Sequence, residues 1–216
     1  MPIINMVYKK KKWWKPWANT LIYCPLVSDY TDHSGNSNTI NIKHTPTLAT
    51  YWGVACAYLD QLVCLYTDIL SLTTYTMSVW VNHQWWKWSE WLILVQWKNT
   101  WVWSGVRWWL YQSKFTASIV NVGYSTQYTV NYTWWHLVTF TRNGNNFKMY
   151  WDGVYKGTYN DTYTSDYRFW INDFYNFDNQ NHQWKWYYSN WIVENKVRTD
   201  TEISDYYNLT KSTYGL

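Results

Sequence analysis

The sequence has few of the residues that soluble domains use for charge, turns and cross-linking. Charged residues make up 15% of the 216 residues, against about 25% in ordinary soluble domains. Glycine contributes only 8 residues, and the three cysteines, Cys24, Cys56 and Cys64, include no CxxC pair. An odd, scattered set of this kind argues against a disulfide framework and against a zinc site. We therefore expect each cysteine to pack as a small apolar side chain.

Long apolar runs and a recognisable signal peptide are also missing. No stretch of about 18 apolar residues occurs, so the sequence predicts no membrane span. Residues 1–8 are too short and too polar for the apolar part of a signal, and the basic residues follow them instead of preceding them. The sequence thus favours a place in a virion or an extracellular or cell-surface assembly over export by a cleaved signal.

Positive charge is concentrated at the N-terminus. Lys9–Lys12 and Lys15 account for the net charge of +4, and the remainder is close to neutral. We interpret residues 1–18 as a basic, flexible, solvated arm, with a phosphate- or membrane-binding patch as the alternative. No base-reading motif accompanies the arm, so we predict no nucleic-acid partner.

From residue 19 to residue 216 the chain alternates between short β-rich runs and polar turns, as expected of one all-β sandwich or barrel. The clearest central strand is 75–81, in which apolar residues alternate on one face and Trp80 lies on the other. Both of its faces should therefore be covered. The expected strands are 21–26, 39–42, 75–81, 92–96, 107–112, 117–122, 135–141, 147–151, 154–158 and 187–196.

Turns and one short helix separate these strands. Asn143-Gly144 predicts a hairpin, and Asp152-Gly153 a further turn. Thr199 followed three residues later by Glu202 predicts a capping box and a helix that ends at Tyr206 or Tyr207. Residues 50–65 fit either a strand pair or a short helix.

Four segments occur in an order that resembles a known family: 75–81 (YTMSVWV), 135–141 (WHLVTFT), 143–153 (NGNNFKMYWDG) and 190–207 (NWIVENKVRTDTEISDYY). The chain resembles the laminin-G-like branch of the concanavalin A-like lectin/glucanase superfamily over roughly residues 19–208. The resemblance implies an all-β fold of two antiparallel sheets packed face to face in jelly-roll order.

The superfamily includes glucanases, but the pattern for catalysis is missing. Glycosidases place two carboxylates on either side of the scissile bond, and the glucanases carry them in a Glu-x-Asp-x-x-Glu pattern. The only glutamates are Glu90, Glu194 and Glu202, and none has an aspartate two residues later. Other nucleophile and zinc motifs are also absent. We predict that the chain is not an enzyme, with a glycoside hydrolase the least favoured alternative.

The resemblance also implies a calcium ion near a sheet edge, held by hard oxygen ligands. Asn172, Asp173 and Asp178, with Asn179 beside them, are the best candidates; Asp152 is less suitable, because its Asp-Gly context already indicates a turn. The alternative interpretation of the cluster is an ordinary polar loop.

The same loop offers groups for a sugar. Tyr175 and Phe177 could stack on a pyranose ring while Asn176 and Asn179 hydrogen-bond its hydroxyls. The sequence therefore predicts a non-catalytic, lectin-like adhesion domain, of a phage fibre or a cell surface, that binds a glycan or glycoconjugate. The alternative is a purely structural domain that contacts only other proteins of a surface or virion assembly.

Tryptophan is unusually frequent at 21 residues, while glycine is rare at 8. Trp170, Trp186 and residues 85–88 (WWKW) stand where the resembled family or a tight turn would use glycine. We hypothesise that some tryptophans come from UGA codons that the source organism reads as glycine. Trp80 and Trp135 match family tryptophans and would be genuine. The alternative is an aromatic-rich adhesive surface.

Overall fold

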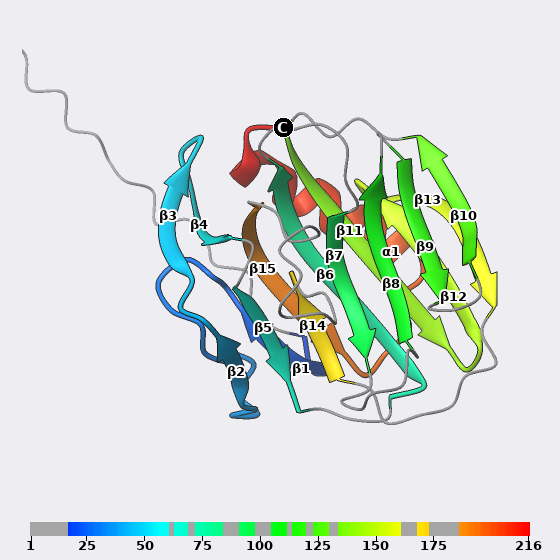
Figure 1. Ribbon diagram of the computed structural model, residues 1–216, viewed down its shortest axis with the longest axis horizontal. Helices are drawn as coiled ribbons and strands as arrows, with labels where there is room; N and C mark the ends of the chain where they lie inside the picture. The colour runs from blue at the N-terminus through cyan, green and yellow to red at the C-terminus, as the bar shows by residue number, and fades with distance from the viewer. Residues whose placement is uncertain are drawn as a thin grey trace, which may run out of the picture.

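The computed structural model describes residues 17–60, 63–68, 72–83, 91–97, 105–111, 114–119, 123–129, 134–160, 168–172 and 186–216. These residues form two antiparallel sheets, of eight and seven strands (Figure 1). Sheet A has the order β13-β12-β11-β6-β15-β4-β3, with β1 also paired to β15, and sheet B has the order β10-β9-β8-β7-β14-β5-β2. The prediction of an all-β fold with antiparallel sheets is confirmed.

Sheet A contains the longest strands of the described chain. Its members are β1 (Thr20–Cys24), β3 (Thr47–Tyr51), β4 (Val54–Leu59), β6 (Thr74–His83), β11 (Trp135–Asn143), β12 (Asn146–Trp151), β13 (Val154–Asn160) and β15 (Trp186–Glu194). Sheet B consists of β2 (Ile40–Lys43), β5 (Cys64–Thr67), β7 (Trp91–Trp97), β8 (Gly105–Tyr111), β9 (Lys114–Ile119), β10 (Gly123–Thr129) and β14 (Arg168–Ile171).

A single apolar core fills the space between the sheets. The alternating residues of β6, including Met77 and Val79, are fully buried in it. Tyr75 of sheet A meets Phe169 of sheet B edge-on, with ring centroids 4.9 Å apart. The predicted alternation in residues 75–81 is therefore confirmed, because the odd-numbered apolar side chains face the other sheet.

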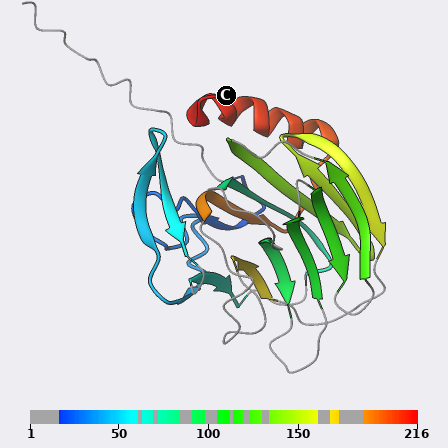
Figure 2. The same ribbon diagram turned by 45° about the horizontal axis from the view of Figure 1, so that its top comes forward.

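The second face of sheet A is covered by the C-terminal helices α1 (Asp200–Thr210) and η1 (Lys211–Tyr214), on the side away from sheet B (Figure 2). Trp80 is fully buried there and stacks on Tyr214 with ring centroids 3.9 Å apart. Both faces of β6 are thus covered, as its sequence predicts. The described part of the chain contains no helix long and apolar enough to cross a membrane.

Helix α1 begins as predicted but ends later. The Thr199 side chain accepts a hydrogen bond from the Glu202 N–H, and the Glu202 carboxylate accepts one from the Thr199 N–H, which forms the capping box. The helix runs to Thr210 instead of Tyr206 or Tyr207. The expected end was wrong because burial of Ile203, Tyr206 and Thr210 against sheet A favours further helical residues.

Both predicted turns are confirmed. Asn143 pairs with Asn146 around the β11–β12 turn, and Trp151 pairs with Val154 around Asp152 and Gly153. Gly153 has φ +75°, and a Cβ placed on it would lie 2.9 Å from the Tyr207 Cβ. This turn therefore requires glycine both for its backbone angle and for the approach of α1.

His136 and Asp152 tie the same turn to β11. The Asp152 carboxylate lies 2.7 Å from His136 Nδ1 and accepts a hydrogen bond from the Leu137 N–H at 3.0 Å. His136 is buried and lies beside the Trp151 ring. These contacts give His136 a structural role, as expected of a histidine within a strand.

Three strands were not predicted: β3, β10 and β14. The ambiguous segment 50–65 contains β4 and the start of β5, so the strand interpretation is correct there. All three cysteines are buried thiols outside any disulfide, as expected of small apolar side chains.

Candidate functional site

The predicted ligand-binding loop lies almost entirely outside the described residues. Tyr175, Asn176, Phe177 and Asn179 belong to it, as do the candidate metal ligands Asp173 and Asp178. Their prediction is unaffected by the structure. The described residues contain no group of three His, Cys, Asp or Glu side chains that could share a metal ion.

Asn172 is the one candidate ligand that the structure places. It is buried at the end of β14 with φ +57°. Its amide donates hydrogen bonds to the carbonyl oxygens of Asp60 at 3.0 Å and Val63 at 2.7 Å, and its side-chain oxygen accepts one from the Tyr188 hydroxyl at 3.4 Å. In this arrangement the Asn172 side chain holds the connection between β4 and β5.

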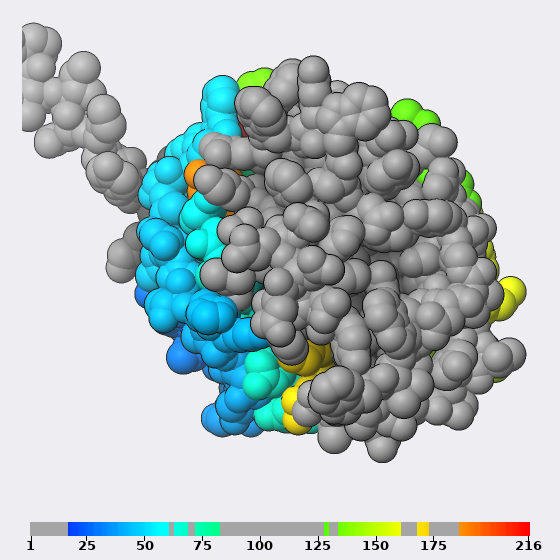
Figure 3. Space-filling view, in the orientation of Figure 1, coloured from blue at the N-terminus to red at the C-terminus, as the bar shows by residue number. Residues whose placement is uncertain are grey.

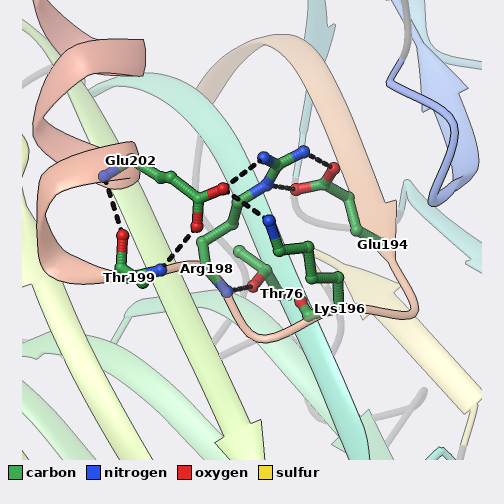
Figure 4. Close-up of polar contacts among 6 residues, drawn as sticks. All are labelled: Thr76, Glu194, Lys196, Arg198, Thr199 and Glu202. Atoms are coloured by element: carbon green, nitrogen blue, oxygen red, sulfur yellow. Dashed lines mark hydrogen bonds and ion pairs between the residues drawn. The ribbon is translucent and has the colours of Figure 1, made fainter.

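A buried ionic cluster lies where β15 leads into α1 (Figure 4). Arg198 donates to both carboxylate oxygens of Glu194, at 2.9 and 2.5 Å, and to Glu202 at 3.0 Å. Lys196 donates to the same Glu202 oxygen at 2.5 Å. Thr76 completes the cluster by accepting from the Arg198 N–H at 2.8 Å and donating to the Lys196 carbonyl at 2.6 Å.

The hydrogen bonds and the burial of this cluster shift the pKa values of its two carboxyl groups. The hydrogen bonds from Lys196 and from the Thr199 N–H lower the pKa of Glu202 to about 2. Burial raises the pKa of Glu194, although the bidentate contact with Arg198 opposes that rise. Both carboxylates are therefore engaged by the same guanidinium group.

The space beside the cluster is also too small for a sugar. A cavity of about 10 Å³ lies against Glu194, Arg198 and Ser78, which is room for about one water molecule. Trp17 closes one side, with its ring 3.6 Å from the Arg198 guanidinium carbon. This contact and the ion pairs join the first described residue to β15 and α1, so the cluster is structural.

An aromatic surface lies on sheet A near the β3–β4 hairpin. We call the five side chains Tyr51, Trp52, Tyr58, Trp134 and Tyr187 the aromatic edge. Tyr51 and Tyr187 stack with their planes 6° apart and centroids separated by 4.1 Å. Tyr58 lies 5.2 Å from Tyr187, while Trp52 contacts Tyr51 at 6.0 Å and Trp134 at 5.0 Å.

The strand order explains why these rings meet. Tyr187 of β15 is paired with Tyr58 of β4, and Tyr51 ends β3 at the hairpin that leads into β4. The segments that contain β2, β3 and β4, coloured blue to cyan, form one continuous side of the molecule (Figure 3). Trp52 and Trp134 are exposed, so other molecules can reach the aromatic edge at these two rings.

Trp52 is the most unusual member of the aromatic edge. Its side chain is 65% exposed, and its backbone has φ +52°. Trp52-Gly53 has nearly the same angles as Asp152-Gly153, with the first residue near +53° and the glycine at +75° in both turns. Glycine, asparagine and aspartate suit the first position of such a turn, whereas a bulky residue is strained there.

The structure also places two tryptophans that the sequence marks as anomalous. Trp170 lies inside β14, stacked on Tyr66 with centroids 4.2 Å apart, and Trp186 is the first residue of β15. Both are buried. The indole nitrogen of Trp170 is buried without a hydrogen-bond partner, but so are those of Trp80 and Trp135, so this feature does not separate the anomalous tryptophans from the expected ones.

No protein-family model and no curated protein matches the chain, but solved structures share its fold. The binding domain of botulinum neurotoxin DC in complex with rat synaptotagmin II has a TM-score of 0.68, at 12% identity over 88% of this chain and 51% of that one. The same binding domain in complex with SialylT has a TM-score of 0.68, at 13% identity over 89% of this chain and 52% of that one.

A third similar structure concerns botulinum neurotoxin type C, whose cell entry is dependent upon interaction with two ganglioside molecules. Its TM-score is 0.68, at 13% identity over 88% of this chain and 51% of that chain. The chain spans about half the length of these neighbours. At such low identity the likeness establishes the fold.

Proposed function

We propose that the chain is a non-catalytic domain that binds a carbohydrate or glycoconjugate, and that its sandwich is a jelly roll of the laminin-G-like, concanavalin A-like kind. The observation that carries the proposal is the similarity of nearly the whole chain to neurotoxin structures, one of them a binding domain in complex with SialylT and another from a toxin that depends on gangliosides. Sandwich folds support many functions, so a direct measurement of glycan binding is the decisive test of the proposal.

The engagement of the described glutamates supports a binding role over catalysis. Glu194 and Glu202 share Arg198, whereas a glycosidase needs one carboxyl to donate a proton and another to attack or to activate water. Glu90 lies outside the described residues. We therefore expect no release of sugar from polysaccharides; measured hydrolysis would contradict the proposal.

A glycan array probed with the whole chain tests the binding function. We expect saturable binding to a subset of glycans that free ligand displaces. A uniformly silent array would favour the second candidate, a structural domain that contacts other proteins of a surface or virion assembly. The synaptotagmin complex of a similar domain is the observation that favours this candidate.

Our first proposed ligand contact is the loop that contains Tyr175, Asn176, Phe177 and Asn179. We further propose that this loop binds calcium through Asn172, Asp173 and Asp178. Calcium that binds only the folded state raises the melting temperature by mass action. We expect such a rise on adding calcium, but no rise on adding the same concentration of magnesium, which fits less readily into a flexible oxygen site. An unchanged melting temperature with calcium would contradict the metal site.

A further inference from the structure

Three tyrosines of the aromatic edge present solvent-accessible hydroxyl groups beside their rings. Tyr51, Tyr58 and Tyr187 are half-buried on neighbouring strands, and their hydroxyls make no hydrogen bond to any described residue. Because these hydroxyls reach solvent, a ligand can replace the water that they bind. Apolar ring faces next to free hydroxyls match a pyranose, which has an apolar C–H face and a rim of hydroxyls.

The charges around these tyrosines favour a neutral sugar. The cation–ring contacts made by the described Lys and Arg side chains all involve rings outside the aromatic edge. A carboxylate does lie close to these tyrosines, because Asp60 follows Tyr58 by two residues at the end of β4 and, after burial, contributes to raising the pKa of Tyr58. A carboxylate at this position repels an acidic sugar and leaves a neutral one unaffected.

The rings of the aromatic edge form one connected set of contacts. A pair of stacked rings with flanking aromatics can cover one or two sugar units.

We propose that the aromatic edge is a second glycan contact, at which a neutral pyranose lies against Tyr51, Tyr58 and Tyr187 with Trp52 and Trp134 at its side. The inference rests on the proposed glycan-binding function and adds to it a site and a ligand class. The site lies on β3, β4 and β15, apart from the loop of residues 172–179.

Titration of the whole chain with a neutral oligosaccharide selected on the array, and with its sialylated counterpart, tests the proposal. The variants are Tyr51→Ala and Tyr187→Ala, with Tyr187→Phe to separate loss of the hydroxyl from loss of the ring. Tyr155→Ala is the matched control, because Tyr155 is an exposed tyrosine on β13 outside the aromatic edge. Circular dichroism and thermal unfolding establish that each variant is folded.

We expect each alanine variant to bind the neutral oligosaccharide about tenfold more weakly, a loss equivalent to about 1.4 kcal/mol. Tyr187→Phe should lose less affinity than Tyr187→Ala, and Tyr155→Ala should bind as tightly as the unaltered chain. Preference for the sialylated ligand, or unchanged affinity in folded Tyr51→Ala and Tyr187→Ala, would overturn this site while leaving glycan binding itself intact. Absence of all glycan binding by the unaltered chain would instead overturn the proposed function and the site together.

Discussion

At the scale of single residues, backbone angles decide which side chains fit and which are strained. Asp152 and Trp52 occupy equivalent positions in two hairpin turns, each followed by glycine. Asp152 uses its carboxylate to bind His136 and the Leu137 N–H. The exposed ring of Trp52 makes contacts with Tyr51 and Trp134 but no hydrogen bond of this kind to the turn, so residue and backbone conflict at this position.

Replacement of Trp52 by glycine should stabilise the protein. Glycine adopts the positive φ of position 52 freely, and relief of the strain should add about 1 kcal/mol to the free energy of unfolding. Chemical denaturation of the unaltered chain and of Trp52→Gly measures the difference. A lower stability in the variant would mean that the ring contacts with Tyr51 and Trp134 outweigh the strain.

The codons give a second, independent test of the same anomaly. If UGA is read as glycine in the source organism, Trp52, Trp170 and Trp186 should be encoded by UGA, and Trp80 and Trp135 by UGG. Mass spectrometry of the protein from its natural host would then show glycine at the first three positions. UGG at both Trp170 and Trp186 would end the hypothesis. With glycine at position 52, the tyrosines would form the centre of the aromatic edge.

At the scale of elements, the sequence predicted strands well where side chains alternate between two buried faces or where a turn signal is strong. Residues 75–81 and the Asn143–Asn146 turn are examples. Strand β3 was missed because it is a short strand at the edge of sheet A. Strand β14 was missed because its pairing with β5 and β7, which are distant in the sequence, determines it more than its local pattern does. The aromatic edge was missed for the same reason, since it requires the order of β3, β4 and β15.

The contact between α1 and the β12–β13 turn can be isolated with two glycine substitutions. Gly153→Ala and Gly35→Ala both place a side chain at positive φ, but only at Gly153 would the new Cβ meet another element, at 2.9 Å from the Tyr207 Cβ. We expect Gly35→Ala to cost about 1 kcal/mol and Gly153→Ala about 1–3 kcal/mol more. Equal losses in the free energy of unfolding, measured with urea, would show that α1 can move away from residue 153 without destabilising the protein.

The ionic cluster at the start of α1 should make stability depend on pH. The pKa of Glu202 is about 2 in the folded protein, below the ordinary value of about 4.3. The ionised Glu202 carboxylate therefore makes its full contribution to the free energy of unfolding above about pH 5, and this contribution is lost as the pH falls toward 2.

We expect Glu202→Gln, which can still accept the capping hydrogen bond, to be about 1 kcal/mol less stable at pH 7, a figure reduced for partial solvent screening. The difference between the two proteins should vanish near pH 2. Urea unfolding at several pH values measures it, and a difference that stays constant with pH would contradict the assigned role of the charge.

At the scale of the whole molecule, one point of close contact joins the two sheets at an edge. Gly157 of β13 lies beneath the Tyr128 ring of β10, and a Cβ on Gly157 would lie 1.8 Å from the Tyr128 hydroxyl oxygen. Only glycine allows this approach. The close contact explains how strands from different sheets meet at the β10 and β13 edges of the sandwich.

Gly157→Ala should therefore destabilise the protein by about 1–3 kcal/mol, and the loss should shrink when Tyr128 is also replaced by alanine. A double-mutant cycle on the free energy of unfolding measures the coupling between the two positions. Additive losses would mean that β10 and β13 do not depend on one another.

The position of β15 has a consequence for how the protein is made. This last strand lies inside sheet A, where it pairs with β1, β4 and β6. During synthesis those three strands leave the ribosome long before their shared partner and carry unpaired backbone edges until it arrives. Sheet A can close only after residue 194 has been translated, so these edges are exposed to aggregation during most of the synthesis of the chain.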